Sequence, residues 1–556
     1  MRKSTETGAQ ALVRSLEKAG VEVVFGYPGG NALDLFDAIR TARFRFVLGR
    51  HEQGCVHMAD GYARALGRPG VALVTSGPGA TNTITALAAA NMDGVPLVVI
   101  SGQVPLSQIG TDAFQEADMT GICRAVTKHS FLVKSADEIP ETVAEAFYIA
   151  THGKPGAVVI DVPQNVQREL TAATYPERVC LRAYHPESAA TPRELNRLAQ
   201  LLNGARRPLI YAGGGVISAG ASKDVAALAH KAQIPVVTTL MGLGAFDGRD
   251  RLSLGMAGLH GTVAANRAID AADVILALGV RFSDRITGSV DRLPDYARRA
   301  KIVQVDCDPS SIDKNVRVAL GIVADIKDLL TTVGSRVRPA EHADWLRETD
   351  GWKKRFPVAW KPMHRGVIMP QQVVESVDRA TGGRAVLVTD VGQHQMWCAR
   401  HFTHALPRHF LTSGGMGAMG FGIPAAIGAA IARPDRTIVA VVGDGGAQMT
   451  FGELAVAAEQ DVPLAVVVVN NGCLGMVRQQ QERFFGGRYS GVMLRDAKGR
   501  YRPDFVKLAK AYGIPAARVS DPSRLDAAVR RAVRAKRPTL LEVMVEPFAN
   551  VSGKVL

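Results

Sequence analysis

Asp444 and Asn471 are the side chains whose type and placement most clearly indicate chemistry. They lie in TIVAVVGDGGAQMTFGELAVAAEQDVPLAVVVVNN (437–471), where each follows an apolar, β-branched run and a short helix-like segment separates the two runs. A strand–helix–strand unit makes its strands parallel neighbours, so both side chains should lie at the carboxyl ends of adjacent strands, where open α/β sheets bind ligands. A carboxylate and an amide oxygen suit Mg²⁺, which keeps positions open for phosphate oxygens.

Gly443, Gly445 and Gly446 surround Asp444 and let the backbone approach a diphosphate closely. An ordinary βαβ crossover ending in turn residues is the alternative interpretation, but spacing, residue types and strand placement all agree with a ligand site. The GDG at 443–445, followed by NN at 470–471, resembles the diphosphate-binding motif of thiamine-diphosphate enzymes. The sequence therefore predicts a site for Mg²⁺ and a diphosphate.

A further carboxylate, Glu52, follows the strand-like FRFVL (44–48) and opens a predicted helix within RHEQG (50–54). A glutamate in a first helical turn commonly stabilises the helix dipole and needs no other role. Beside a thiamine-diphosphate site it has a function, because it pairs with the aminopyrimidine ring and favours the imino tautomer, whose nitrogen removes the thiazolium C2 proton. The cofactor then performs the carbonyl chemistry while the protein orients it.

Two glycine-rich segments leave alternatives open. SGGMGAMG (413–420) contains GxGxxG, but residue 440, about 20 positions on, is Ala, so the match to a dinucleotide fingerprint is weak. A tight turn before a helix of small residues fits better, with Met419 either an apolar wedge beneath a bent cofactor or a core residue that fills a gap. YAGGG (211–215) ends a predicted strand and either holds a nucleotide phosphate or only turns the chain.

Composition and charge exclude several classes of protein. Of the 556 residues, 47% are hydrophobic and 21% are charged, which is typical of a globular protein. The formal charge of +14 comes from scattered Lys and Arg without interleaved aromatics, so we expect a basic surface that attracts anionic metabolites and no nucleic-acid site. The six cysteines form no CxxC pair, MRKSTETGAQ lacks the apolar core of a signal peptide, and no apolar run could span a bilayer. We expect a cytoplasmic protein without a membrane segment.

Apolar strands alternate with helical stretches along the whole chain, which predicts an α/β protein of three doubly wound parallel-sheet domains. The domains are predicted at 1–170, 193–335 and 370–556. Residues 171–192 and 336–369 lack periodicity and are interpreted as irregular connections.

The first and third domains share a local plan. GYARALGRPGVALVTSGPG (61–79) and GIPAAIGAAIARPDRTIVAVVGDGG (422–446) each contain a small-residue helix, an Arg-Pro turn, an apolar strand and a glycine-rich turn. This internal repeat suggests two related sheets that face one another.

The chain resembles the catalytic subunits of the acetolactate (acetohydroxyacid) synthase family, which use thiamine diphosphate and FAD, from about residue 7 to about residue 548. The resemblance implies the thiamine-diphosphate-binding fold, with an N-terminal pyrimidine-binding domain, a central FAD-binding-type domain and a C-terminal diphosphate-binding domain. The motifs that show it are FGYPGG (25–30), RHEQG (50–54), TSGPGATN (75–82), IGTDAFQE (109–116), GLHGTVAAN (258–266), RFSDRITG (281–288), VGQHQMW (391–397), TSGGMGAMGFGIPAAIGA (412–429), GDGG (443–446) and NNGCLGMV (470–477).

The resemblance also implies a role for each site residue. Glu52 activates the cofactor, and Mg²⁺ is bound by Asp444, Asn471 and the backbone carbonyl of Cys473. The residues implied on the substrate side of the catalytic site are Phe114, Gln115, Arg285 and Gln480. The remaining thiamine-diphosphate contacts are Pro78, Asn82, Val391, Gly392, Gln393, His394, Gly417, Met419, Gly443, Gly445, Gly446, Gly475 and Met476. The FAD contacts are Lys154, Gly213, Gly214, Gly215, Thr239, Leu240, Gly258, Leu259, His260, Gly279, Arg281, Asp306 and Asp325.

In this family the activating glutamate and the metal site come from different chains. The resemblance therefore implies a homodimer or homotetramer, with a regulatory small subunit as a further partner.

Four departures from the family pattern lie mostly around the substrate channel. Gln480 stands where the family usually has a tryptophan that shapes the pocket for the second 2-oxo acid, and Gln164 stands in place of a lysine. Lys154 replaces an arginine near FAD and lacks its planar bidentate fork. The closing segment ANVSGKVL lacks the usual proline-rich end.

The leading hypothesis is a carboligase of branched-chain amino acid biosynthesis. It decarboxylates pyruvate and joins the two-carbon unit to a second 2-oxo acid, giving 2-acetolactate, with FAD in a structural role because the reaction has no net redox step. The alternative is a related thiamine-diphosphate carboligase or decarboxylase with an aldehyde or another 2-oxo acid as acceptor. A non-catalytic homologue would have lost Glu52, Asp444 or Asn471, and all three are present.

Overall fold

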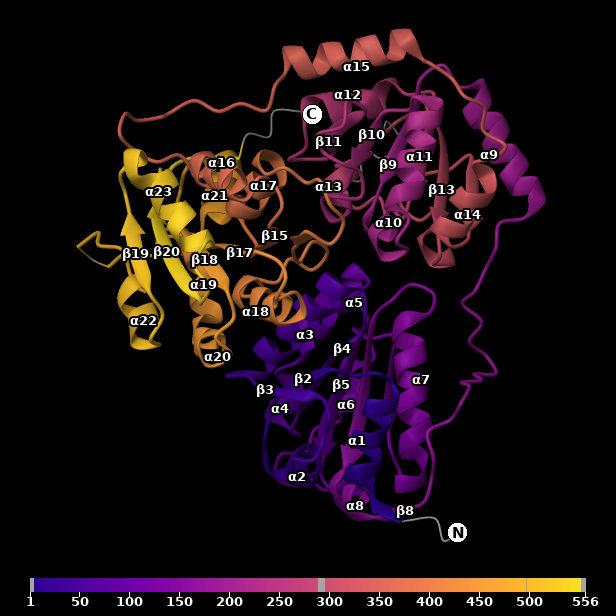
Figure 1. Ribbon diagram of the computed structural model, residues 1–556, viewed down its shortest axis with the longest axis vertical. Coiled ribbons are helices and arrows are strands. Elements are labelled where there is room, and N and C mark those ends of the chain that lie inside the picture. Colours follow the sequence, from indigo (N-terminus) through magenta and orange to yellow (C-terminus); the bar gives the residue numbers. More distant parts are fainter. Residues whose placement is uncertain (1–4, 289–295, 497, 552–556) are drawn as a thin grey trace.

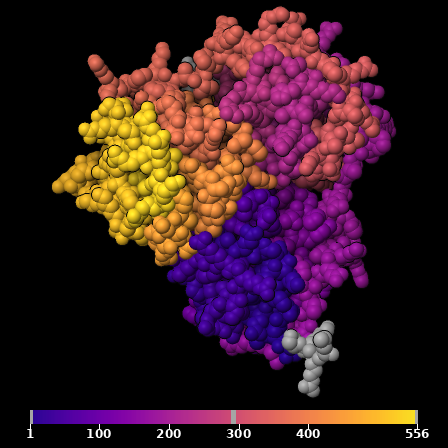
Figure 2. All heavy atoms as spheres, viewed as in Figure 1, coloured from indigo at the N-terminus to yellow at the C-terminus, as the bar shows by residue number. Residues whose placement is uncertain are grey.

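Three parallel sheets form the core of the molecule. The computed structural model describes residues 5–288, 296–496 and 498–551, and neighbouring strands run parallel throughout each of its three six-stranded sheets. Alternate strand residues enter different core clusters, Leu97 and Val99 one and Val98 and Ile100 another, so both faces are covered. The three sheets form three lobes (Figures 1 and 2). The predicted α/β class with three doubly wound parallel sheets is confirmed.

The first and third sheets have the same strand order, β3-β2-β4-β5-β7-β6 and β16-β15-β17-β18-β20-β19. This agrees with the internal repeat in the sequence. The first sheet contains β2 (Val23–Tyr27), β3 (Arg45–Leu48), β4 (Gly70–Val74), β5 (Leu97–Gln103), β6 (His129–Leu132) and β7 (Ala157–Pro163). The third contains β15 (Val386–Thr389), β16 (Phe410–Leu411), β17 (Ile438–Gly443), β18 (Leu464–Asn470), β19 (Ala516–Val519) and β20 (Thr539–Met544).

The middle sheet has a different order, β11-β10-β9-β12-β13-β14. Numbered along the chain this order is 3-2-1-4-5-6, the arrangement of dinucleotide-binding α/β domains, whose ligand crosses the point where the strand order reverses. Here that point lies between β9 and β12. The strands are β9 (Pro208–Ala212), β10 (Val236–Thr238), β11 (Ser253–Met256), β12 (Val274–Leu278), β13 (Lys301–Asp306) and β14 (Leu320–Val323).

Several of the helices that cover these sheets begin at side-chain caps. Helix α1 (Gly8–Lys18) begins at a Thr7–Gln10 capping box. The other helices of the first domain are α2 (Leu33–Ile39), α3 (Glu52–Leu66), α4 (Pro78–Thr81), α5 (Ile84–Asp93), α6 (Met119–Cys123), α7 (Ile139–Thr151) and α8 (Gln164–Arg168). Those of the middle domain are α9 (Pro192–Gly204), α10 (Gly214–Ser218), α11 (Ser222–Ala232), α12 (Val263–Ala271), α13 (Asp284–Thr287) and α14 (Ile326–Val333). Those of the third are α16 (Pro370–Thr381), α17 (Gln393–His401), α18 (Gly422–Ala432), α19 (Asp444–Met449), α20 (Leu454–Glu459), α21 (Gly475–Phe485), α22 (Phe505–Ala511) and α23 (Pro522–Val533).

Helices α3 and α18 join the first domain to the third (Figure 1). Their buried residues belong to one core cluster that runs through both sheets. A Cβ on Gly61 would lie 2.0 Å from the carbonyl oxygen of Ala425, and a Cβ on Gly428 would lie 1.9 Å from that of Met58. Because Met58 faces Gly428 while Gly61 faces Ala425, the two helices run antiparallel and their backbones touch.

The expected irregular connection at 336–369 is wrong over part of its length. Residues Ala343–Arg355 form a helix, α15, that lies across the middle domain (Figure 1). Trp345 donates a hydrogen bond from its indole nitrogen to the carbonyl oxygen of Pro208 at 2.9 Å, and Leu346 enters the core of the middle domain. Charged residues cover most of the helix, so its apolar stripe is too narrow to show a clear period in the sequence.

The strands of the three six-stranded sheets lie at 23–163, 208–323 and 386–544, inside the three predicted domains. A short antiparallel pair, β1 (Glu6–Thr7) with β8 (Leu170–Thr171), ends one residue past the predicted limit at 170. The domain boundaries stay predictions. Residues 552–556 of the closing segment are outside the described residues. Across the described ranges, no helix has the length and apolar character needed to cross a membrane.

Replacing Gly428 with Ala should lower the thermal unfolding midpoint, because the new methyl group lands on the Met58 carbonyl. We expect a cost of about 1–3 kcal/mol in the free energy of unfolding. Gly351→Ala is the control, since a Cβ there meets nothing within 4 Å. Ala also has a higher helix propensity than Gly at this exposed position of α15. Equal midpoints for the two variants, measured by differential scanning fluorimetry, would contradict the close helix contact.

Candidate active site

Asp444 lies where the sequence predicts it, at the carboxyl end of a central strand. It follows β17 directly and begins α19, while β17 pairs in parallel with β18. Its side chain is buried, and one carboxylate oxygen accepts the Gly472 N–H at 2.8 Å. Burial raises the pKa of Asp444 to about 7. A divalent cation at this carboxylate would favour the ionised form and offset that shift.

Asn471 follows the adjacent strand β18, just before Gly472, whose N–H binds Asp444. Its side-chain oxygen accepts the Cys473 N–H at 3.1 Å. A Cβ on Gly475, the first residue of α21, would come within 2.6 Å of the Asn471 amide nitrogen, so only glycine leaves this space open. Burial raises the pKa of the Cys473 thiol, so its sulfur stays protonated at pH 7.

The surroundings of Asp444 contain buried polar atoms that lack partners. His394 Nε2 and Gln393 Oε1, at the start of α17, have no hydrogen-bond partner among the described residues. Burial lowers the pKa of His394 to about 4, so its ring is neutral at pH 7. A Cβ on Gly443 would lie 3.0 Å from His394 Nδ1. Because buried polar groups are nearly always paired, these atoms indicate a ligand or ordered water beside Asp444 that offers a donor to the Gln393 oxygen.

Asp390 is a site residue that the sequence analysis missed. It follows β15, is 1% exposed, and accepts backbone N–H bonds from Val391 at 2.8 Å, Gly420 at 3.1 Å and Gly422 at 2.8 Å. A Cβ on Gly446 would lie 2.3 Å from its carboxylate. In the sequence, Asp390 resembles Asp444, because each is an aspartate at the end of an apolar strand. Asp390 lacks a companion motif like the NN at 470–471 that accompanies Asp444.

The loop at 413–420 reaches the diphosphate motif. Gly417 has a positive φ of 68°, which glycine adopts without strain. Met419 is half-buried, and its methyl carbon would lie 3.5 Å from a Cβ on Gly445. Gly417, Met419 and the residues Val391 and Gly392 that follow β15 therefore border the same space as Asp444. Met476 lies nearby in α21 and packs on the third-domain core.

Glu52 begins α3 in the first domain. Its carboxylate accepts a hydrogen bond from the Asn82 amide at 3.0 Å, and it lies 3.4 Å from the position of a Cβ on Gly79, next to Pro78. The backbone of Gln115, with a positive φ of 63°, packs on Gly77. The structure thus brings Glu52, Asn82, Pro78 and Gln115 together, and the neighbouring Phe114 is 86% exposed.

Glu52 and Asp444 lie at opposite ends of the antiparallel α3–α18 pair. Glu52 begins α3, six residues before Met58, which faces Gly428. Because the helices are antiparallel, Glu52 lies near the end of α18. Asp390 and the Asp444 turn lie where α18 begins, because the Gly422 N–H binds Asp390. The 11 residues of α18 correspond to a length of about 16 Å.

The remaining predicted substrate residues lie apart from Glu52. Arg285 is on α13 of the middle domain, with its side chain 68% exposed and 3.7 Å from Asp284. Gln480 is exposed on α21.

The predicted nucleotide residues gather at the strand-order reversal of the middle sheet. Gly213–Gly215 follow β9, and Gly279, with φ 61°, follows β12. The two turns touch, since a Cβ on Gly213 would lie 2.0 Å from the Gly279 carbonyl oxygen. The other predicted residues on nearby strand ends and turns are Thr239, Leu240, Gly258, Leu259, His260, Arg281, Asp306 and Asp325. Lys154 reaches toward them from the first domain, 3.9 Å from Asp308.

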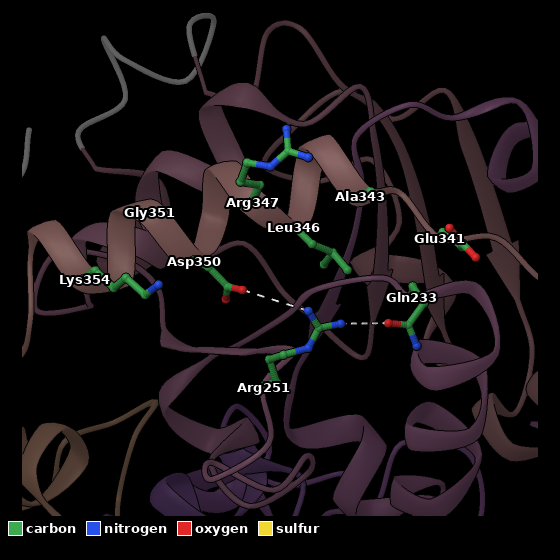
Figure 3. A pocket seen from close by; sticks show the side chains of 9 residues that line it. All are labelled: Gln233, Arg251, Glu341, Ala343, Leu346, Arg347, Asp350, Gly351 and Lys354. Atoms are coloured by element: carbon green, nitrogen blue, oxygen red, sulfur yellow. Dashed lines mark hydrogen bonds and ion pairs between the residues drawn. The ribbon is translucent and has the colours of Figure 1, made fainter.

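A separate hollow of about 760 Å³ lies beneath α15 (Figure 3). Arg251 extends into it between Asp350, 3.9 Å away, and Gln233, to which it donates a hydrogen bond at 2.9 Å (Figure 3). No predicted site residue lines this hollow, so it is distinct from the candidate active site.

Comparison with known proteins agrees with the fold and the site. Three family models match the chain: the N-terminal TPP binding domain of thiamine pyrophosphate enzymes at 6–122, the central domain at 195–333 and the C-terminal TPP binding domain at 390–543. The chain therefore belongs to the three-domain thiamine pyrophosphate enzymes.

Whole-chain relatives narrow this class. The chain is 47% identical to the acetolactate synthase of Mycobacterium bovis over 514 residues, 91% of this chain and 82% of that protein. It is 44% identical to the acetolactate synthase isozyme 3 large subunit of Escherichia coli over 558 residues, 98% and 96% of the two chains. It is 42% identical to the mitochondrial acetolactate synthase catalytic subunit of Saccharomyces cerevisiae over 560 residues, 97% and 81%. The chain is a member of the acetolactate synthase family, and the resemblance inferred from the sequence is confirmed.

Replacing Asp390 with Asn should loosen the turns around the metal site, because an amide cannot accept every backbone N–H that the carboxylate accepts. We expect a loss of about 1–3 kcal/mol in stability for a buried N–H left unpaired, together with weaker binding of thiamine diphosphate and Mg²⁺. Asp521→Asn is the control, since Asp521 caps α23 at the surface and Asn caps equally well. Unchanged cofactor titrations, followed by tryptophan fluorescence, would contradict the role of Asp390.

Proposed function

We propose that the chain is the catalytic subunit of an acetolactate synthase, which decarboxylates pyruvate and joins the two-carbon unit to a second pyruvate to give 2-acetolactate. The observation that best supports this is the pair of buried Asp444 and Asn471 on parallel strand ends, in a chain 42–47% identical to acetolactate synthases along most of its length. When bound, thiamine diphosphate supplies the electron sink that a 2-oxo acid needs in order to lose CO₂.

In this proposal the third domain binds the metal and the diphosphate. Asp444, Asn471 and the Cys473 carbonyl would give Mg²⁺ three oxygen ligands and would leave positions for diphosphate oxygens. Among the described residues, no cluster of three His, Cys, Asp or Glu side chains is placed to hold a metal ion. Met419 would support the cofactor from below, next to Gly445.

The first domain supplies the activating carboxylate. Glu52 would accept or hold a proton at the aminopyrimidine ring, with Asn82 orienting its carboxylate through the hydrogen bond at 3.0 Å. The substrate would meet Phe114 and Gln115 on this domain. Arg285 would bind the carboxylate of a 2-oxo acid, because its guanidinium is exposed and cationic.

FAD is the proposed cofactor of the middle domain. The 3-2-1-4-5-6 strand order and the touching turns at Gly213 and Gly279 support a dinucleotide at this place. Its role would be structural, because the carboligation has no net redox step.

A single chain separates the two halves of the site by about the length of α18. This supports a homodimer, or a homotetramer built from dimers, in which Glu52 of one chain meets Asp444 of another. The relatives are named large or catalytic subunits, so we also propose a regulatory small subunit and a role in branched-chain amino acid biosynthesis. All six cysteines are free, which supports a reducing compartment such as the cytoplasm.

The product formed from pyruvate alone tests the proposal against its alternative. The holoenzyme with thiamine diphosphate, Mg²⁺ and FAD should form acetolactate. A different acceptor preference remains the second candidate because Gln480 and Gln164 replace the usual tryptophan and lysine. Release of acetaldehyde, or ligation only with added aldehydes, would favour that alternative.

Glu52→Gln should keep the fold and metal binding but lower kcat by about 10²–10⁴, because a proton-transfer group is removed. Glu141→Gln is the matched control, since Glu141 occupies the first turn of α7 and tests the helix-dipole interpretation alone. Near-normal turnover in Glu52→Gln would refute its role.

Gln480→Trp should raise the preference for 2-oxobutyrate over pyruvate as the second substrate by about tenfold, a size typical of one methylene in an apolar pocket. Gln480→Ala controls for loss of the amide without a new ring. An unchanged product ratio from a mixture of the two acids would show that residue 480 does not determine the choice of acceptor.

A further inference from the structure

The carboxylate of Asp93, the last residue of α5, contacts all three domains. Its side chain is 0% exposed. Arg64 of α3 donates to it at 3.0 Å, and Arg281 of the middle domain lies 4.0 Å away. In the third domain it accepts the backbone N–H groups of Gly414 at 3.0 Å and Gly415 at 2.7 Å.

These contacts hold one side of the loop that carries the proposed cofactor residues. Asp93 fixes the loop at Gly414 and Gly415, and Asp390 fixes its other side at Gly420. Gly417 and Met419 lie between these two anchors. The position of the loop therefore depends on Asp93 of the first domain as much as on Asp390 of the third domain, to which the loop belongs.

Arg281 connects the same carboxylate to the middle domain. It follows the Gly279 turn at the strand-order reversal, where a dinucleotide is expected. Its guanidinium also donates to the carbonyl oxygen of Met92 at 2.5 Å. One guanidinium thus touches the residue that anchors the loop and the residue before it.

We propose that Asp93 is a positioning residue that couples the two cofactor sites, so that FAD in the middle domain and thiamine diphosphate at the loop strengthen each other's binding. This inference rests on the proposed function. FAD would immobilise Arg281, and Arg281 in turn would fix Asp93 and the turn at Gly414. Thiamine diphosphate then binds a loop that is already ordered and loses less conformational entropy.

The coupling must be reciprocal, because both ligands act on the same folded protein. The equilibrium dissociation constant of FAD, obtained by stepwise dilution of the holoenzyme and the rise in flavin fluorescence, measures one direction. In the wild-type protein, thiamine diphosphate with Mg²⁺ should lower that constant at least about fivefold, the lower end of typical coupling.

In Asp93→Asn the ratio of the FAD dissociation constants without and with thiamine diphosphate should fall to about one. Asp60→Asn is the matched control: Asp60 is equally buried and also pairs with Arg64, at 3.2 Å, but its hydrogen bonds do not reach the loop. It should lose stability and keep the wild-type ratio.

Gly415→Ala tests the loop without changing any charge, since the added Cβ would lie 2.6 Å from Met92 Cγ and 2.8 Å from the Asp93 carboxylate. It should lower the ratio as Asp93→Asn does, and it serves where Asp93→Asn does not fold. A wild-type ratio in either variant, or a ratio of one in the wild-type protein, would overturn the coupling. The flavin absorption spectrum taken before dilution separates this failure from absence of FAD, which would instead overturn the cofactor assignment and the coupling with it.

Discussion

The backbone contact between α3 and α18 is the constraint on which the rest of the structure depends. Gly61 and Gly428 have no room for a Cβ, because each faces a carbonyl of the opposite helix at about 2 Å from where that atom would lie. The contact makes the cores of the first and third sheets continuous. It also brings Arg64 and Asp93 against the glycine-rich loop: Arg64 donates to the carbonyl oxygen of Thr412, just before the loop, and Asp93 accepts the Gly414 N–H. The position of the cofactor loop therefore follows from how closely two helices approach.

The antiparallel direction of the pair has a chemical consequence. It leaves Glu52 at the end of α3 that is far from the start of α18, where Asp390 and the Asp444 turn lie. In the proposed function, proton transfer at one end of the bound cofactor and metal binding at the other would then require a second copy of the chain. The first and third sheets share a strand order, and a proposed second copy would be related to the first by a two-fold axis, the commonest symmetry of homodimers.

Local patterns in the sequence predicted the parts of the site that strand ends define. The apolar runs before Asp444 and Asn471 placed both side chains correctly, since a parallel strand's carboxyl end follows from periodicity and turn residues alone. The roles of Asp390 and Asp93 could not be predicted, because their donors are backbone N–H groups about 30 and 320 residues further along the chain. Helix α15 was missed because only Trp345, Leu346 and Thr349 are buried among its charged residues.

Subunit complementation tests the central claim, that Glu52 and Asp444 act from different chains. Glu52→Gln and Asp444→Ala should each be nearly inactive alone. After mixing and reassembly, half of the dimers are mixed and each contains one intact site, so about a quarter of the wild-type rate of acetolactate formation should return. No recovery above the two separate variants, in mixed dimers demonstrated by mass spectrometry, would contradict a site shared between chains.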